Sequence, residues 1–422
     1  MAIQIADPAQ THAFTRIDFD HFHQATIKEL IATHIGLFQH ELVGLKSLSF
    51  VTAAGDGYTY LPGDGSLTVV PGVHGALKVS LCPDAFSDFF HELLSISGLK
   101  VTRRMEQMAG DIEEFRAWEP TLRAIFAGRP IYSSEVPARL RNARNQPFDI
   151  EKSFDYSEFE QQQDEMREYF SALGYLHIRQ VFSAQEVDEI RDHVLDAIKQ
   201  STPDDGKSWW SLLEDGREVP TRINYLNRFS DFFDRLGNDA RVQALGKLHD
   251  AKQLVCLDRV DGPMVFIKSP NVKTGLANLL WHRDCDLGGH PIMCPIIQVG
   301  IQLDRASAEN GQVKVVIGSH LYSSHVVDID NEGDLPVHAF NTEPGDVTLH
   351  FGDTLHCTPA PTGPSAQRKV LYYKFEKPEM FDTIPAGGHY NDLLFNASHG
   401  GRVATRATTW TNNNQLDGDL DQ

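Results

Sequence analysis

The sequence predicts a protein of the α+β class, in which a mixed N-terminal domain precedes a strand-rich sandwich, jelly roll or barrel. Two observations carry this prediction. Residues 254–376 hold many short β-type runs punctuated by Gly, Pro, Asn and Asp, with no helix of normal length between them. Residues before about 150 instead alternate between helical and strand-like patterns. With 422 residues, the chain is long enough for two domains.

The N-terminal elements follow from local patterns. Apolar residues at helical spacing predict a helix over 22–42, and alternation around a Gly-Asp-Gly turn predicts a hairpin over 57–72. A strand is expected at 75–81, and helices at 84–95 and at 114–128, the last with a proline interruption. We expect these elements to form an α+β accessory domain over residues 1–150.

The next elements open the second predicted domain, residues 151–400. Residues 155–200 read as a helix, a Gly turn, a short strand and a second helix. Ser183 followed by Glu186 fits a capping box at the start of that second helix. The polar stretch 139–153 is the predicted linker, and residues 401–422 are a polar C-terminal tail.

Composition narrows the classes of partner. The formal net charge is −20, from 58 acidic and 38 basic residues, which argues against nucleic acid or an anionic membrane surface as the main partner. The five cysteines include no CxxC, so a reducing compartment is expected. We find neither the pattern of a signal peptide nor a run of about 18 apolar residues. The sequence therefore predicts a cytoplasmic chain without a membrane span.

One hexapeptide, "WHRDCD" at 281–286, carries the strongest chemical signal. In a strand, His282 and Asp284 would point to the same face and aim an imidazole and a carboxylate at one point. Downstream, "GDVTLHFGDTLHCTPAP" at 345–361 offers His350 and His356 as a further ligand. Two histidines and one carboxylate leave positions open on a metal, as in non-haem Fe(II) oxygenases. A solvated strand end is the alternative for the hexapeptide alone.

The order of these motifs resembles the phytanoyl-CoA dioxygenase family of Fe(II)/2-oxoglutarate oxygenases. The pattern WHxD is followed by "ENGQVKVVIGSH" at 309–320, by the segment at 345–361 and by an arginine. Upstream, "YFSALGYLHIRQVFSAQEVDEIR" at 169–191 is similar to the opening segment of that family. The resemblance covers roughly residues 160–378. It implies a double-stranded β-helix, the jelly-roll or cupin-like barrel, with flanking helices.

The resemblance also implies a site. His282, Asp284 and His356 would be the iron ligands, which leaves His350 as the rival third ligand or a neighbouring histidine. Arg368, twelve residues after His356, would bind the distal carboxylate of 2-oxoglutarate, because guanidinium pairs bidentately with carboxylate. Thr358 would add a hydrogen bond.

The implied reaction hydroxylates an unactivated C–H bond of a small organic molecule, lipid-like or a secondary metabolite. Dioxygen is consumed, and 2-oxoglutarate becomes succinate and CO2. The carboxylate of Asp284 favours hydroxylation, or a related desaturation or ring formation, over halogenation. The chain departs from the family at Arg283, where Gln is common, and at Ile317, where Pro is usual. The sequence identifies neither the substrate nor the oligomeric state.

Two other functions fit parts of the sequence. One is a non-catalytic protein that binds an apolar ligand and carries a degenerate barrel. The other is a cupin-type metalloenzyme that needs no cosubstrate, and Arg368 discriminates against it because such an enzyme needs no dicarboxylate clamp. Residues 58–132 also resemble sterol-carrier-protein-like domains, which implies an apolar tunnel. The alternative there is an α+β appendage used for dimerisation or for covering the barrel.

Further residues near the motifs have simpler interpretations. We expect Lys268 to be a solvated lysine and His320 to have a structural hydrogen-bonding role. Gln298 and Gln302 alternate along one predicted strand, so one of them is expected to face the barrel interior. Packing roles are expected for Cys285, Cys294 and Cys357, and loop positions for His290 and His325.

Overall fold

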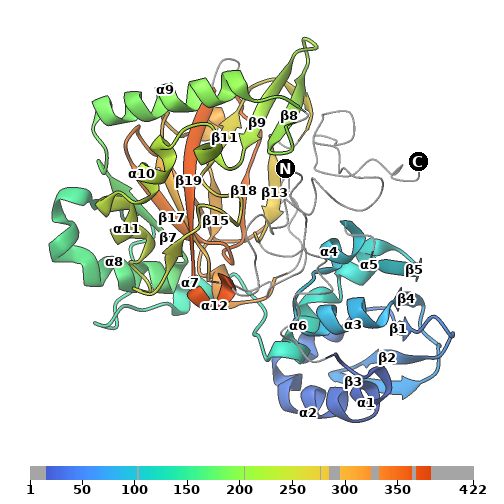
Figure 1. The fold of residues 1–422 in the computed structure, drawn as a ribbon. Helices are drawn as coiled ribbons and strands as arrows, with labels where there is room; N and C mark the ends of the chain where they lie inside the picture. The colour runs from blue at the N-terminus through green and yellow to red at the C-terminus, as the bar shows by residue number, and fades with distance from the viewer. Residues whose placement is uncertain are drawn as a thin grey trace.

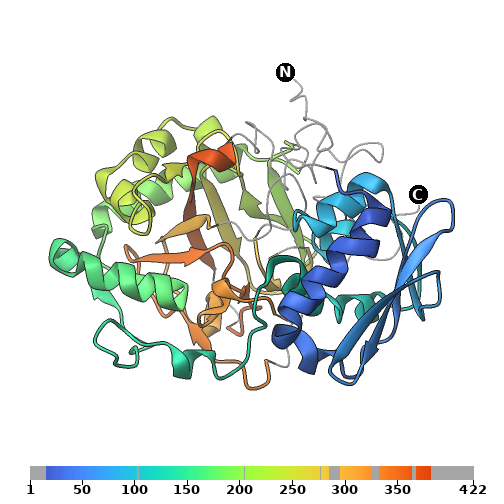
Figure 2. The same ribbon diagram turned by 90° about the horizontal axis from the view of Figure 1, so that it is seen from below.

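The computed structural model describes residues 16–101, 104–203, 205–275, 277–284, 295–324, 332–363 and 367–381. These residues form an N-terminal lobe (residues 16–127), a connector (128–153) and a C-terminal lobe (154–381), and the two lobes lie side by side (Figures 1 and 2). Each lobe has its own hydrophobic core. The predicted α+β class is confirmed, with several sheets and helices in one chain. The domain boundaries at 150 and 400 stay predictions.

The N-terminal lobe is built on a five-stranded sheet with the order β3-β2-β1-β4-β5. Its strands are β1 (Leu48–Val51), β2 (Gly57–Gly63), β3 (Ser66–Pro71), β4 (Leu77–Leu81) and β5 (Met105–Ala109). Strands β1 and β4 run parallel, and the other neighbours are antiparallel. The predicted hairpin over 57–72 is confirmed: Gly63 pairs with Ser66, and Gly65 closes the turn with a φ of +65° that favours glycine.

Helices pack against this sheet around an aromatic core. They are α1 (Phe19–His21), η2 (Phe22–Thr26), α2 (Ile27–Phe38), η3 (Gln39–Leu42), α3 (Pro83–Phe90), α4 (Ile96–Val101), α5 (Ile112–Arg116) and α6 (Glu119–Ala127). The helix predicted over 22–42 contains a π-helical turn, η2, and starts earlier. The helix predicted over 84–95 ends at Phe90, and Glu92 has a left-handed φ of +57°. The proline interruption at 114–128 separates α5 from α6, where Pro120 lies in the first turn.

A ten-stranded sheet forms one layer of the C-terminal lobe. Its strands are β6 (Phe154–Asp155), β7 (Tyr175–Arg179), β8 (Ser208–Leu213), β9 (Glu218–Ile223), β10 (Leu254–Val255), β11 (Met264–Lys268), β12 (Val272–Thr274), β14 (Ile297–Gln302), β17 (Val347–Phe351) and β19 (Arg368–Glu376). The order is β12-β8-β9-β11-β19-β14-β17-β7-β6, and β10 pairs with β19. Strand β19 stands in the middle of this order, and every residue of β19 is buried.

A four-stranded sheet forms the second layer, with the order β13-β18-β15-β16. Its strands are β13 (Leu279–His282), β15 (Lys314–Val316), β16 (Val337–Ala339) and β18 (His356–Thr358). All three pairings are antiparallel, and His282 lies opposite His356 between β13 and β18. Strand β13 lies on the side of the C-terminal lobe nearest the N-terminal lobe (Figure 1).

Helices flank the ten-stranded sheet away from β13 (Figure 1). They are α8 (Phe159–Leu173), α9 (Ala184–Gln200), α10 (Phe232–Gly237) and α11 (Ala240–Gly246). Short helical pieces are α7 (Val136–Arg139) in the connector, α12 (Pro378–Phe381), η4 (Tyr156–Glu158), η5 (Leu226–Arg228), η6 (Ala308–Asn310) and η7 (Ser319–Leu321). The helix–turn–strand–helix prediction over 155–200 is confirmed, and so is the capping box of Ser183 and Glu186. Asn310-Gly311 ends η6.

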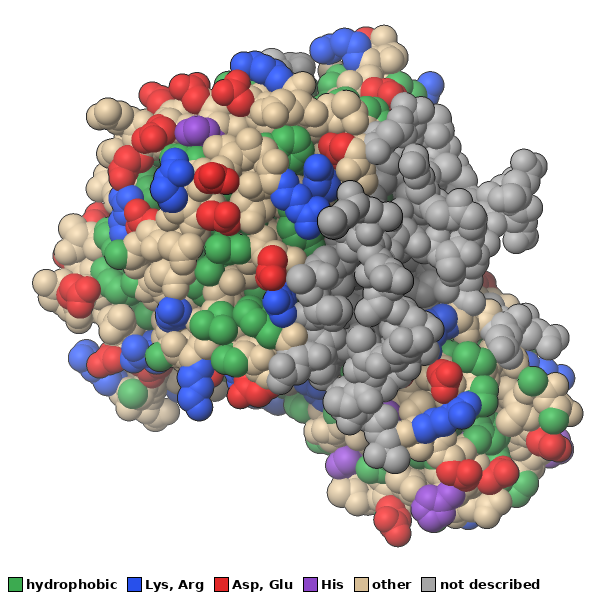
Figure 3. Space-filling view, viewed as in Figure 1, with side chains coloured by type: hydrophobic (Ala, Val, Ile, Leu, Met, Phe, Trp, Pro, Cys, Tyr) green, Lys and Arg blue, Asp and Glu red, His purple; other side chains and the backbone are tan. Residues whose placement is uncertain are grey.

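Acidic and basic side chains are intermingled on the face of the C-terminal lobe shown in Figure 3. Within the described part of the chain, no helix combines the length and the apolar character that a membrane crossing requires. The predicted C-terminal tail, Cys285, Cys294, His290 and His325 lie outside the described residues.

Candidate metal centre

The structure brings His282, Asp284 and His356 together. The Oδ1 atom of Asp284 lies 3.9 Å from Nε2 of His282 and 3.8 Å from Nε2 of His356. All three side chains offer a ligand atom within 4.8 Å of the others. Two atoms that each lie about 2.1 Å from one ion can be separated by at most about 4.2 Å. The separations from Asp284 fit ligands that share an ion, and they are too long for hydrogen bonds.

Each imidazole ring is oriented by the backbone carbonyl of the residue two positions earlier in the chain. Nδ1 of His282 lies 2.7 Å from the carbonyl oxygen of Leu280, and Nδ1 of His356 lies 2.7 Å from that of Thr354. A ring that donates its Nδ1–H to a carbonyl carries its lone pair on Nε2, the tautomer that binds a metal through Nε2. Both rings therefore present a metal-binding atom toward Asp284.

Asp284 is held from two sides. Its backbone N–H donates to the carbonyl of Gly352 over 2.9 Å, and Nε2 of Gln298 donates to Oδ2 over 2.8 Å. These contacts leave Oδ1 directed at the two histidines. Gln298 is thus the member of the predicted glutamine pair that contacts the candidate ligands, whereas Gln302 donates to Thr348 and to the Gly300 carbonyl.

Burial and charge set the protonation of the metal-free site. Burial lowers the pKa of His356 to about 4. The pKa of His282 is also lowered to about 4, by burial and by the His356 ring, although 33% of its side chain is exposed. Burial alone would raise the pKa of Asp284, but the two histidines and Lys374 outweigh it, so that pKa lies below its ordinary value. At neutral pH, two neutral imidazoles face an ionised carboxylate.

His350, the rival third ligand, lies next to this group on β17. Its ring centroid is 4.7 Å from that of His356, and it lies opposite Gln298 across the sheet. Its Nδ1 is buried with no hydrogen-bond partner among the described residues. The three residues whose ligand atoms converge are His282, Asp284 and His356, so His350 borders the candidate site. His320 lies elsewhere, with Nε2 3.0 Å from the carbonyl oxygen of Ser171.

Arg368 begins β19 and is buried, with 3% of the residue exposed. Its Nη2 donates to the carbonyl of Gly311 over 2.8 Å, while Nε is buried with no partner. Among the described residues, no carboxylate forms an ion pair with this guanidinium. Burial lowers the pKa of Arg368 from its high ordinary value. The side chain therefore has an unused donor and no counter-charge in contact.

Lys268 lies directly opposite Arg368, on the neighbouring strand β11. The expectation of a solvated lysine is wrong: only 1% of the residue is exposed. Its Nζ donates to Oδ1 of Asn278 over 2.9 Å and to the carbonyls of Thr358 and Pro359 over 2.6 and 2.8 Å. Burial and the neighbouring Arg368 hold the pKa of Lys268 well below its ordinary value. The three oxygen acceptors around Nζ offset the free-energy cost of burying Lys268, and no sequence pattern reveals them.

Thr358, predicted to add a hydrogen bond to 2-oxoglutarate, ends β18 and is buried. Its Oγ1 accepts a hydrogen bond from the backbone N–H of Leu279 over 3.3 Å. The hydroxyl proton remains available for a further acceptor, because a hydroxyl both accepts and donates.

The sequence reasoning missed a buried charge cluster beside Asp284. Asp261 is fully buried and forms ion pairs with Lys374 and, over 2.6 Å, with Arg222. Lys374 lies opposite Gln298 in the register of β14 and β19. Strand alternation could have identified Lys374, because it shares parity with Arg368 along β19. No comparable signal marked Asp261.

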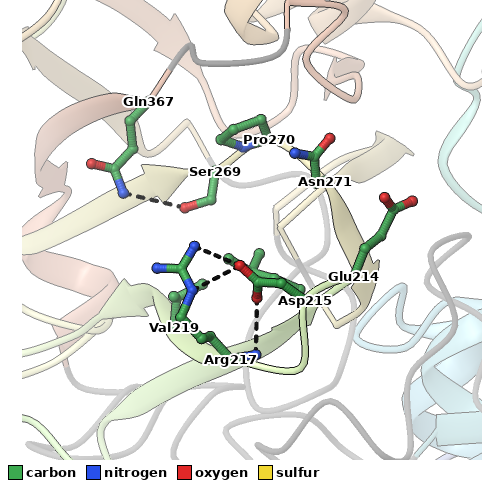
Figure 4. A pocket seen from close by; sticks show the side chains of 9 residues that line it. Glu214, Asp215, Arg217, Val219, Ser269, Pro270, Asn271 and Gln367 are labelled. Atoms are coloured by element: carbon green, nitrogen blue, oxygen red, sulfur yellow. Dashed lines mark hydrogen bonds and ion pairs between the residues drawn. The ribbon is translucent and has the colours of Figure 1, made fainter.

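A cleft of about 590 Å³ opens at the end of the β8–β9 hairpin (Figure 4). Its lining is Leu213, Glu214, Asp215, Arg217, Val219, Ser269, Pro270, Asn271 and Gln367. Ser269 and Gln367 directly follow and precede Lys268 and Arg368, so strand alternation directs them away from the buried cations. The candidate metal ligands do not line this cleft, and we place the chemistry at the ligands.

Comparison with known proteins supports the resemblance inferred from the motifs. A family model described as phytanoyl-CoA dioxygenase (PhyH) matches residues 170–370, within the 160–378 span of the motifs. The resemblance to that family is confirmed over these residues. The match does not reach the N-terminal lobe, where the sterol-carrier-like resemblance stays a prediction. No curated protein matches the chain in a sequence search.

Solved structures provide more distant likenesses. AviO1 from Streptomyces viridochromogenes Tue57 is 20% identical, with a TM-score of 0.42 over 51% of this chain and 95% of its own. SnoN, a non-haem α-ketoglutarate-dependent epimerase from nogalamycin biosynthesis, is 18% identical, with a TM-score of 0.40 over 52% of this chain and 83% of its own. EctD from S. alaskensis is 19% identical, with a TM-score of 0.42 over 50% and 76%. SnoN was crystallised with Fe3+ and α-ketoglutarate, and EctD with Fe or with 2-oxoglutarate. Likenesses this distant identify neither the substrate nor the reaction.

Proposed function

We propose that this chain, whose residues 170–370 match the phytanoyl-CoA dioxygenase family, is an Fe(II)/2-oxoglutarate-dependent oxygenase with a jelly-roll catalytic domain. The observation that carries the proposal is the convergence of His282, Asp284 and His356 between the two sheets of the C-terminal lobe. We further propose that the enzyme uses dioxygen to hydroxylate a small organic substrate at an unactivated C–H bond.

The donor set fits Fe(II). Two imidazole nitrogens and one carboxylate oxygen are ligands of intermediate and hard character, and three protein ligands leave coordination positions open. The backbone carbonyls behind the imidazole rings and Gln298 behind Asp284 support the arrangement. These contacts orient the ligands before any ion arrives.

The surroundings of Arg368 fit a dicarboxylic acid. Two buried cations, Arg368 and Lys268, lie opposite each other on β19 and β11. An unpaired buried charge costs much free energy, and a bound carboxylate would supply the missing partner. The unused Nε of Arg368 is a donor for such a group. We assign the distal carboxylate of 2-oxoglutarate to Arg368, with Thr358 as a second donor.

The roles of the protein residues follow from these contacts. A bound iron would activate dioxygen, which is the oxidant, while 2-oxoglutarate would supply two electrons and become succinate and CO2. His282, Asp284 and His356 hold the metal at the edge of the small sheet. Arg368 orients the cosubstrate. By resemblance, a carboxylate at Asp284 would favour hydroxylation over halogenation, because it would itself serve as a metal ligand and leave no room for a halide.

An anaerobic titration with Fe(II) and 2-oxoglutarate tests this proposal. The wild type should develop the visible charge-transfer band of the iron–2-oxoglutarate chelate. His356→Ala and Asp284→Ala should abolish it. His40→Ala, which removes an exposed histidine of the N-terminal lobe, is the matched control and should retain it. Arg368→Ala should leave iron binding intact and weaken 2-oxoglutarate binding about 100-fold, as expected for loss of one partner of a buried charge pair.

The same titration distinguishes the proposed oxygenase from the two alternative functions. Iron binding without a band at any 2-oxoglutarate concentration would favour the metalloenzyme that needs no cosubstrate. No iron binding at all would favour the non-catalytic binding protein. With the band established, succinate release would score candidate substrates, and small uncharged and anionic molecules would be screened first.

A further inference from the structure

Arg283 lies between two candidate ligands in the sequence but on the other face of the strand. Because side chains alternate along an extended segment, Arg283 points away from the face that carries His282 and Asp284. Its guanidinium donates to three backbone carbonyls: Nη1 to that of Asp353, and Nη2 to those of Ser319 and Tyr322 over 3.0 and 2.7 Å.

These three carbonyls belong to two separate segments. Asp353 lies three residues before His356, so Arg283 ties the end of β13 to the segment that delivers the third candidate ligand. Ser319 and Tyr322 belong to the brace loop, which we define as residues 317–324. One guanidinium thus fixes the two ligand-bearing segments to each other and to the brace loop. Its planar fork of donors suits several carbonyls at once, which a glutamine amide cannot match.

The connector binds the same loop from the other side. The backbone N–H of Tyr132 donates to the Ser323 carbonyl over 2.8 Å, and the N–H of Ser323 donates to the Pro130 carbonyl over 3.0 Å. The Tyr132 hydroxyl donates to the carbonyl of Ile317 over 2.6 Å. Ile131, between these contacts, packs on the core of the N-terminal lobe. The brace loop therefore has the N-terminal lobe on one side and Arg283 on the other.

An ion pair fixes the start of the connector to the N-terminal lobe. Nη2 of Arg129 lies 3.0 Å from Oε2 of Glu92, and Arg123 of α6 contacts the other carboxylate oxygen over 3.2 Å. Glu92 adopts its left-handed conformation at this point, just beyond α3. Backbone strain of this kind persists where the surrounding contacts determine it. The contacts run without a break from Glu92 to the candidate metal ligands.

We propose that Arg283 is a positioning residue for the metal centre and that it couples the ligand-bearing strands to the N-terminal lobe through the brace loop. The proposal rests on the proposed function. It assigns the N-terminal lobe a role in holding the geometry of the site, whatever else that lobe binds.

A double-mutant cycle on Arg283→Gln and Tyr132→Phe tests the coupling. Arg283→Gln should weaken Fe(II) binding by about 10- to 100-fold, the usual loss when an outer-shell partner of a ligand is removed. It should also shift the charge-transfer band at saturating iron and 2-oxoglutarate, which a mere loss of stability would not do. Tyr132→Phe should weaken Fe(II) binding in the same direction by a smaller factor. The double variant should lose less than the product of the two factors, because both act through one loop.

Arg139→Gln is the matched control. It removes an exposed arginine of the connector that pairs with Glu135 at the N-cap of α7, and it should leave Fe(II) affinity and the band unchanged. Wild-type affinity and an unshifted band in Arg283→Gln would overturn the positioning role. Independent, multiplicative effects in the double variant would overturn the coupling to the N-terminal lobe. Should Arg283→Gln fail to fold, Arg283→Lys replaces it in the cycle.

Hydrogen exchange of the metal-free protein separates this proposal from the proposed function. Amides of residues 317–324 should exchange faster in Arg283→Gln and in Tyr132→Phe than in the wild type. Faster exchange would support the role of Arg283 and Tyr132 in holding the brace loop, even if the wild type showed no chelate band. A missing band would count only against the proposed oxygenase function. Unchanged exchange in both variants would overturn the brace.

Discussion

Single residues hold the candidate site through contacts with backbone carbonyls. His282 and His356 each bond the carbonyl two positions earlier. Lys268 donates to two consecutive carbonyls, and Arg283 donates to carbonyls of two separate segments. A backbone carbonyl does not titrate, so the acceptor side of these contacts does not depend on pH. The ligand geometry is therefore set by the fold of the backbone.

Lys268 provides the sharpest test at this scale. Lys268→Met should lower the free energy of unfolding by about 2–4 kcal/mol, because it leaves Asn278 and two backbone carbonyls without their donor. It should also weaken 2-oxoglutarate binding, since the carbonyl of Thr358 loses its anchor. Urea unfolding and the chelate titration measure the two effects. Lys273→Met on β12, an exposed lysine, is the control. Equal stability of the two variants would contradict the assigned role of Lys268.

The candidate site residues were predictable from the sequence, and the contacts that support them were not. Spacing and motif order identified His282, Asp284, His356 and Arg368, because a metal or a dicarboxylate needs particular side chains. The partners that hold them are mostly backbone carbonyls, which every residue possesses. No sequence pattern distinguishes the carbonyls of Asp353, Thr358 or Pro359 from those of their neighbours. The sequence therefore predicts neither the burial of Lys268 nor the contacts of Arg283.

At the scale of secondary-structure elements, the register of paired strands brings the candidate site residues together. Pairing of β13 with β18 sets His282 opposite His356, and pairing of β11 with β19 sets Lys268 opposite Arg368. Alternation predicted the hairpin over 57–72 and placed His282 and Asp284 on one face. It could not predict where a helix stops, as Glu92 shows, because a left-handed residue after α3 depends on the ion pairs with Arg123 and Arg129.

Gly352 directly follows β17, and a substitution there tests how closely the backbone must approach Asp284. A Cβ atom there would lie 2.4 Å from Cγ2 of Ile296 and 3.3 Å from side-chain atoms of Asp284. Gly352→Ala should therefore displace Asp284 and weaken Fe(II) binding about tenfold, in the range for disturbed outer contacts of a ligand. Adding Ile296→Ala should restore part of the affinity. Gly36→Ala, where a Cβ meets nothing within 4 Å, is the control, and anaerobic iron titration is the measurement. Wild-type affinity in Gly352→Ala would show that Asp284 tolerates the displacement.

At the scale of the whole molecule, the lobes are joined by the connector, whose first residues contact the brace loop and whose later residues pack on the core of the C-terminal lobe. The family match begins at residue 170, so the fold of the C-terminal lobe could be inferred by resemblance, whereas the N-terminal lobe could be inferred only from local patterns. Those patterns gave a mixture of helices and strands. They could not give the order β3-β2-β1-β4-β5, because the parallel pairing of β1 and β4 joins segments distant along the chain.

Both lobes bury neutral histidines, which predicts acid sensitivity of the metal-free protein. Burial lowers the pKa to about 4 for His23, His320, His350 and His356. The ordinary value is 6.5, so between pH 6.5 and 4 the unfolded chain binds more protons than the folded one. The free energy of unfolding should therefore fall as pH falls through this window, by about 2 kcal/mol per histidine between pH 7 and 5.

Urea unfolding at pH 7, 6 and 5 measures this slope. His23→Phe keeps an aromatic ring against Tyr58 and removes one titrating group, so its slope should be shallower than that of the wild type. A stability that is constant from pH 7 to 5 would contradict the prediction.

The candidate ligands are separated by a long stretch of chain, and this has a consequence during synthesis. The core of the N-terminal lobe needs only residues up to 131, so that lobe can fold while the ribosome is still making the remainder. His282 and Asp284 emerge next, but His356 and the central strand β19 emerge last of the described strands. A chain cut before residue 356 would therefore lack one of the three candidate ligands and all of β19, so its candidate metal site would be incomplete.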